Sequence, residues 1–287
     1  MKLLLSSFAF LLLLTSATPK ELSSPKTLKK ALELNIVSAT IKGNDESPHY
    51  FNPLILELKN LTHVSLSILI MPGDIFKSDD PEYQDILITK FERIEIKAGT
   101  TLRIPLFGMC IQEFNSAPGS EQKYSLAERG GDDLSLLANR INKEKAFNIA
   151  AQQAVWSVTD GYPLDKIGNL SDEQSDQARE MVAGLESSDT TVTRGLTIRR
   201  NNNNGLIKRQ MDGNFKYRIS KESEVHIALF NEQNIVVKEL FNDTAVTAGE
   251  HDFRYTMNEY IDPTKYYYVR LIIDGEIKIN FEMKPRS

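Results

Sequence analysis

Short runs in which apolar and polar residues alternate dominate the first part of the chain. Residues 54–58 read LILEL, residues 102–106 read LRIPL, and glycine, asparagine and proline separate such runs from one another. This spacing is typical of an antiparallel sandwich or barrel. We therefore expect antiparallel strands from about residue 32 to residue 112. The segments that predict them are 32–37, 54–58, 64–70, 86–96 and 102–106.

The pattern becomes helical after Pro118. Residues 132–145 (DDLSLLANRINKEK) begin with acidic side chains and end with lysine, the order that a helix dipole favours. Residues 148–158, rich in alanine and glutamine, and residues 171–185 predict two more helices. A β-rich segment followed by helices indicates one α+β domain, which we place at residues 18–189.

Strand-like runs return between residues 215 and 283. Asp274-Gly275 lies between two of them and is a signal for a tight hairpin. Residues 190–211 contain the run NNNNG between basic residues and show little apolar periodicity, so we expect a linker there. The sequence thus predicts a second, all-β sandwich at residues 212–287.

Composition narrows the classes of function. The chain has 287 residues, of which 41% are hydrophobic, enough for a core in each of two domains. Its formal net charge of −5 argues against nucleic acid or an anionic membrane as a general partner.

The first residues resemble an export signal. Lys2 precedes the apolar run 3–14, and Thr15-Ser16-Ala17 supplies the small residues that a signal peptidase accepts. The alternative is a buried first helix. Because a membrane-spanning helix needs about 20 apolar residues, the run is too short to be one, and no later run is long enough. We expect a signal peptide at residues 1–17 and a secreted or cell-surface protein.

The C-terminal segments follow a known order. SEVHIALF (223–230), IVVKEL (235–240), AGEH (248–251) and YYVRL (267–271) together resemble the immunoglobulin-like C-terminal modules of type IX secretion cargo and of flagellar hook-cap proteins. The resemblance implies an immunoglobulin-like sandwich that contacts a secretion machinery through residues 212–287. A plain spacer module is the alternative.

The chain contains a single cysteine, Cys110, in the run FGMCIQ, and AQQAVWSVTDG follows at residues 151–161. This arrangement resembles the thioester domains of bacterial surface adhesins, which carry a Thr-Gln-x-Ala-Ile-Trp signature. The resemblance implies a bond between Cys110 and Gln152. Ala154 would then allow close approach of helix and strand, and Trp156 would shield the bond.

Such a bond requires the thiol and the carboxamide to be held in contact, which folding provides. Ammonia leaves, and the product acylates amines. The alternative is an inert, buried thiol, since cysteine is among the most buried residue types.

These observations favour adhesion over catalysis. The leading hypothesis is covalent capture of an amine on a surface ligand, protein or glycan. Non-covalent binding or a structural surface role is the alternative. An enzyme ranks last, because no catalytic constellation stands out, and four scattered histidines with one cysteine give no zinc site. No cofactor is expected.

Overall fold

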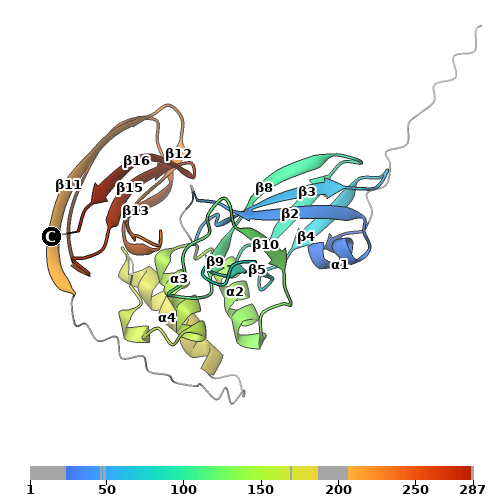
Figure 1. The fold of residues 1–287 in the computed structure, drawn as a ribbon, viewed down its shortest axis with the longest axis horizontal. Helices are drawn as coiled ribbons and strands as arrows, with labels where there is room; N and C mark the ends of the chain where they lie inside the picture. The colour runs from blue at the N-terminus through green and yellow to red at the C-terminus, as the bar shows by residue number, and fades with distance from the viewer. Residues whose placement is uncertain (1–23, 46, 48–49, 169, 187–205, 286–287) are drawn as a thin grey trace, which may run out of the picture.

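The computed structural model describes residues 24–45, 47, 50–168, 170–186 and 206–285 (Figure 1). The expected signal peptide at 1–17 and most of the expected linker lie outside these residues. The described chain combines an α+β N-terminal part with an all-β C-terminal sandwich, so the predicted fold class is confirmed. Within it, no helix is both long and apolar enough to cross a membrane.

Two sheets build the N-terminal part. One has the order β8-β3-β2-β10-β5-β6-β9, and the other is β1-β4-β7. Leucine and isoleucine side chains from both fill a common buried cluster. The strands are β1 (Lys26–Thr27), β2 (Val37–Gly43), β3 (Leu54–Asn60), β4 (Leu66–Ile70), β5 (Ile75–Ser78), β6 (Ile86–Ile88), β7 (Glu92–Ile96), β8 (Thr101–Leu106), β9 (Gly108–Cys110) and β10 (Lys123–Leu126).

Two strand predictions are wrong in part. Residues 32–37 are not a strand, because helix α1 (Leu28–Glu33) covers their beginning and β2 starts only at Val37. The Thr27 side chain caps this helix by accepting from the N–H of Lys30. Leu28, the first residue of the helix, is buried. Residues 86–96 form two strands, β6 and β7, which belong to different sheets.

The three predicted helices are confirmed as α2 (Asp132–Glu144), α3 (Ile149–Thr159) and α4 (Asp172–Glu186). The 3₁₀ turn Leu164–Lys166 lies between the last two. Asn148 caps α3 by accepting from the N–H of Ala151. Most of α3 is buried, since it lies between the other helices and strand β9. Its small side chains permit this close approach.

The C-terminal sandwich consists of the sheets β11-β14 and β13-β12-β15-β16. Asp274 and Gly275 both have positive φ, at 51° and 79°, as the predicted hairpin requires. β11 begins at Ile207, so the last residues of the segment expected as a linker are strand instead. The strands are β11 (Ile207–Ile219), β12 (Ser223–Asn231), β13 (Val236–Val246), β14 (Gly249–Ile261), β15 (Tyr267–Ile273) and β16 (Glu276–Met283).

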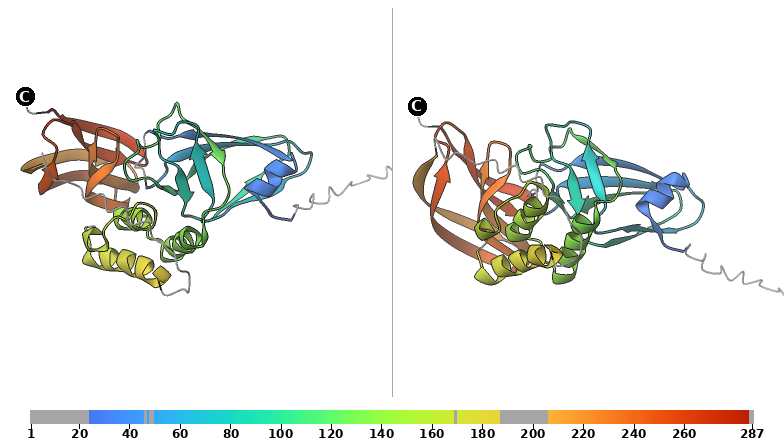
Figure 2. Two further views of the ribbon diagram at one scale, coloured as in Figure 1. Left: turned by 60° about the horizontal axis from the view of Figure 1, so that its bottom comes forward. Right: turned by 90° about the horizontal axis from the view of Figure 1, so that it is seen from below.

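Strand β12 is buried on both of its faces. Val225, Ile227 and Leu229 point into the core of the sandwich. Ala228 and Phe230, on the opposite face, belong to the buried cluster of the N-terminal helices. The sandwich therefore packs against the N-terminal part beside α3, as two further views also show (Figure 2).

Candidate functional site: the Cys110–Gln152 pair

Cys110 is the last residue of β9, a three-residue strand at one end of the seven-stranded sheet. It pairs with Ile86 of β6 on one side. The residue is fully buried, and this burial raises the pKa of the thiol well above its usual value. The sulfur is therefore a protonated thiol at neutral pH.

Gln152 lies on α3 and meets Cys110 on the other side of β9. Its Oε1 accepts from the Cys110 N–H at 2.8 Å, and its Nε2 donates to the Cys110 carbonyl oxygen, also at 2.8 Å. Gln152 is fully buried as well. The structure thus brings together the cysteine and the glutamine that the sequence singled out.

Helix α3 is fixed at both ends around this contact. At its start the Asn148 cap holds the N–H of Ala151, the residue before Gln152. At its end the Thr159 hydroxyl donates to the carbonyl oxygen of Ile111 at 2.6 Å. Ile111 follows Cys110 directly, so the end of the helix is tied to the chain that leaves β9.

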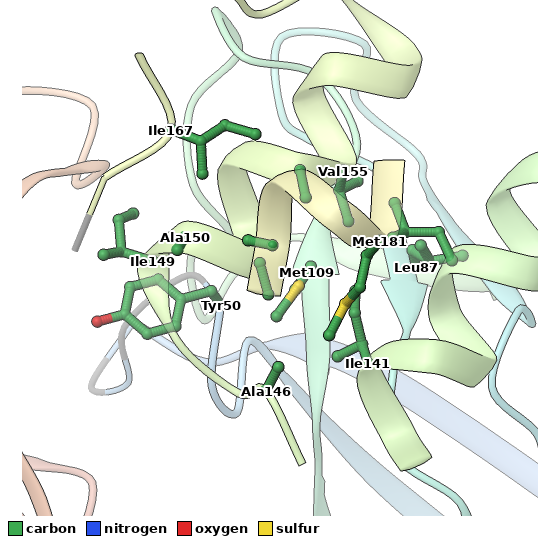
Figure 3. Packing of buried hydrophobic residues seen from close by; sticks show 14 of the residues in the cluster. Tyr50, Leu87, Met109, Ile141, Ala146, Ile149, Ala150, Val155, Ile167 and Met181 are labelled. Carbon is green, nitrogen blue, oxygen red and sulfur yellow. The ribbon is translucent and has the colours of Figure 1, made fainter. Parts of the chain in front are cut away.

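The two residues expected to support the pair, Ala154 and Trp156, are both buried. Ala154 is fully buried in the same cluster as Met109 of β9. Trp156 is 4% exposed and shares a buried cluster with Cys110. Its ring lies 6.4 Å from that of Tyr162. Figure 3 shows the packing beside the site, with Met109 lying among Ile141, Ala150 and Met181.

Sequence reasoning missed a pair of carboxylates beyond Cys110. The Glu113 N–H donates to the Asp160 side chain at 2.9 Å. Burial, together with the negative charge of Asp160, raises the pKa of Glu113 to about 7. These residues are 47 positions apart, and no local pattern in the sequence connects them.

A buried polar cluster between the two domains was also missed. The Tyr50 hydroxyl lies 2.6 Å from His226 Nε2 and donates to Glu239 Oε1 at 2.5 Å. His226 Nε2 and Glu239 Oε1 are 3.2 Å apart. A histidine inside the apolar run SEVHIALF was the one available signal, because a polar side chain in a buried strand needs a partner.

No group of three or more metal-binding side chains occurs among the described residues. No family model, no curated protein and no solved structure matches the chain. The chemistry of the site therefore rests on its own geometry.

That geometry suits condensation between the two side chains. The Gln152 carboxamide is held against the backbone of Cys110 by a fixed pair of hydrogen bonds, and both residues are fully buried. Proximity of this kind replaces a bimolecular encounter by an intramolecular one. The same two hydrogen bonds also satisfy the backbone of a strand whose second side has no other strand beside it in the sheet order.

Proposed function

We propose that Cys110 and Gln152 form an intramolecular thioester, and that this exported surface protein uses it to capture an amine covalently. The observation that carries the proposal is the pair of hydrogen bonds between the Gln152 carboxamide and the backbone of Cys110. It holds the reacting carbonyl group against the residue that supplies the nucleophile.

The thioester forms when the Cys110 thiol displaces ammonia from the Gln152 carboxamide. Cys110 Sγ attacks Gln152 Cδ, the Cδ–Nε2 bond breaks, and the thiol proton goes to the departing nitrogen, which leaves as ammonia. No oxidant or reductant is needed. The Cys110 N–H already donates to Oε1, where negative charge develops during the attack. Such a preorganised donor stabilises the tetrahedral intermediate.

Capture of a ligand opens the thioester, and the amine of the ligand takes the place that ammonia left. An amine attacks Cδ, an amide forms, and the Cys110 thiol is restored. Burial of the pair and of Trp156 keeps water from the thioester in the meantime. This supports a long-lived reactive group on a protein that meets its ligand after export.

Non-covalent binding or a structural surface role is the second candidate. It is favoured by the same two hydrogen bonds, which give Gln152 a structural purpose even if no bond forms. In that case Cys110 is an inert core thiol, and the ligand is recognised elsewhere.

The role of the C-terminal module belongs to the same proposal. Its close packing on the helices favours a fixed part of the protein over a sorting signal that is removed during transport. Deleting residues 212–287 and following export tests this, since unchanged export contradicts a sorting role.

Intact-mass spectrometry of the purified protein decides between the two candidates. We expect a mass lower than the calculated one by one ammonia, and an adduct of one methylamine on the thioester form after treatment with that amine. Cys110→Ala and Gln152→Glu serve as controls and give their calculated masses with no adduct. The full calculated mass of the wild type, with one thiol titrating after denaturation, would refute the thioester.

A further inference from the structure

We propose that the C-terminal sandwich is an autoinhibitory cap that closes the Cys110–Gln152 site until the two domains separate. The inference concerns the regulation of that site and rests on the proposed function. It is carried by three sets of contacts between the sandwich and the N-terminal part.

The first set comes from the turn between β12 and β13. The Asn231 side chain accepts from the N–H groups of Gln233 and Ile235, which makes the turn rigid. The Gln233 carbonyl oxygen accepts from the N–H of Ala117 at 2.9 Å. Ile235, 7% exposed, is the residue of the sandwich that enters the buried cluster of Cys110 and Trp156. The turn therefore lies over the chain that follows β9.

The second set is the apolar outer face of the sheet β13-β12-β15-β16. Ala228, Phe230, Val236 and Ile272 from this face share one buried cluster with the N-terminal helices. That cluster includes Met109 and Ala151, the residues immediately before Cys110 and Gln152. The two domains therefore share one continuous apolar cluster, which extends to the backbone neighbours of both reacting residues.

The third set is the polar cluster Tyr50–His226–Glu239, which acts as a latch. The three side chains are buried, and Asn242 donates to the same Glu239 oxygen at 2.8 Å. Tyr50 comes from the connection between β2 and β3, whereas the other members lie on β12 and β13. The latch thus joins the two domains by directional contacts.

The latch is incompletely satisfied, which makes it releasable. Among the residues that the structure describes, none is a hydrogen-bond partner of the buried atoms His226 Nδ1 and Glu239 Oε2. Each such atom loses its hydration in the closed state and regains it when the domains separate. An interface with this defect is less stable than a fully apolar one of the same size. Such an interface can open when a ligand competes with one domain for the surface of the other.

The test measures how fast methylamine adds to the full-length protein, followed by intact mass. Ile235→Asp and Ala228→Arg each place a charge in the closed interface but leave the core of the sandwich unchanged. Phe281→Asp is the matched control, because Phe281 is 59% exposed on the same sandwich. We expect at least about a tenfold faster reaction in both interface variants and the wild-type rate in the control, since a buried unpaired charge shifts the closed–open equilibrium by more than tenfold.

A second readout separates this proposal from the thioester itself. If no variant shows loss of ammonia, the proposed function fails, and the accessibility of the Cys110 thiol to a maleimide reports on the cap instead. The same tenfold increase is expected for that reaction. Far-ultraviolet circular dichroism checks that each variant is folded. Folded interface variants that react no faster than the wild type with either reagent would overturn the cap.

Discussion

The carboxamide of Gln152 forms hydrogen bonds with both the N–H and the carbonyl oxygen of Cys110, 42 residues earlier in the chain. The two contacts take the place of a neighbouring strand along one side of β9. They bind together the strand and the helix that the proposed chemistry needs, and they explain why a polar side chain is fully buried there.

Replacing Gln152 by glutamate removes the donor and adds a buried charge. The Cys110 carbonyl then faces a carboxylate oxygen, and we expect a loss of at least about 2 kcal/mol in the free energy of unfolding. Gln153→Glu is the matched control, because Gln153 Oε1 only accepts, from the Gly168 N–H, and glutamate retains that role. Urea denaturation of both variants measures the difference; equal stabilities would contradict the pairing.

The raised pKa of Glu113 predicts a pH dependence of stability. A carboxyl group whose folded pKa is about 7, above its ordinary value of 4.5, is stabilising while protonated in the folded state, and this advantage is lost as pH rises through 7. We therefore expect the free energy of unfolding to fall as the pH rises from 4.5 to about 7. The Glu113→Gln variant should show a smaller fall.

Glu224 must be controlled in the same measurement. Burial and the charge of Asp274 raise its pKa to about 7 as well. The comparison is therefore made in a Glu224→Gln background, where Glu113 is the remaining carboxyl group with this pKa among the described residues. A pH profile that Glu113→Gln leaves unchanged in that background would show that Glu113 ionises normally.

Removing the Tyr50 hydroxyl tests the latch. Tyr50→Phe removes the hydroxyl that donates to Glu239 and lies beside His226, which should cost about 1–3 kcal/mol in the free energy of unfolding. Tyr260→Phe is the control, since Tyr260 is 64% exposed, and it should leave stability unchanged. Thermal unfolding of the two variants provides the comparison, and identical midpoints would argue against the latch.

The latch should also weaken in acid. Burial alone would raise the pKa of Glu239, but the hydrogen bond and charge of His226, with the hydrogen bonds of Tyr50 and Asn242, outweigh it and lower the pKa. A lowered carboxyl pKa contributes stability at neutral pH that is lost as pH falls below the ordinary value of 4.5. We expect Glu239→Gln to be less sensitive to acid than the wild type in circular dichroism titrations, and equal sensitivity would contradict the assignment.

The Asn148 cap should contribute to the position of α3. Asn148→Ala leaves the N–H of Ala151 without its partner and should cost about 1 kcal/mol in the free energy of unfolding. Asn139→Ala, on the exposed side of α2, is the control, because its side chain bonds only the preceding turn of its own helix. Urea denaturation measures both, and a similar cost in the two variants would contradict the cap.

Long periodic segments were predictable from the sequence, and short ones were not. The three main helices and the strands of the sandwich after β11 follow apolar periodicity closely. The prediction for residues 32–37 was wrong because the apolar alternation there overlaps the end of a capped helix that begins earlier, at Leu28. β5 and β10 have four residues each, too few for a pattern to register.

Some residues of the candidate site could likewise be predicted from the sequence, and others could not. Cys110 and Gln152 could be named together because the local runs around them resemble a known signature. Tyr50 and Glu239 could not, because they are 189 residues apart and meet only when two separate domains pack together. Such contacts depend on tertiary packing, which no local window of sequence records.

The double-sided burial of β12 has a consequence for the integrity of the molecule. One strand belongs to two cores at once, so the connection between α4 and β11 is not what keeps the halves of the protein associated. A single proteolytic cut in that connection should leave a nicked protein whose two fragments migrate together on a sizing column in the closed state.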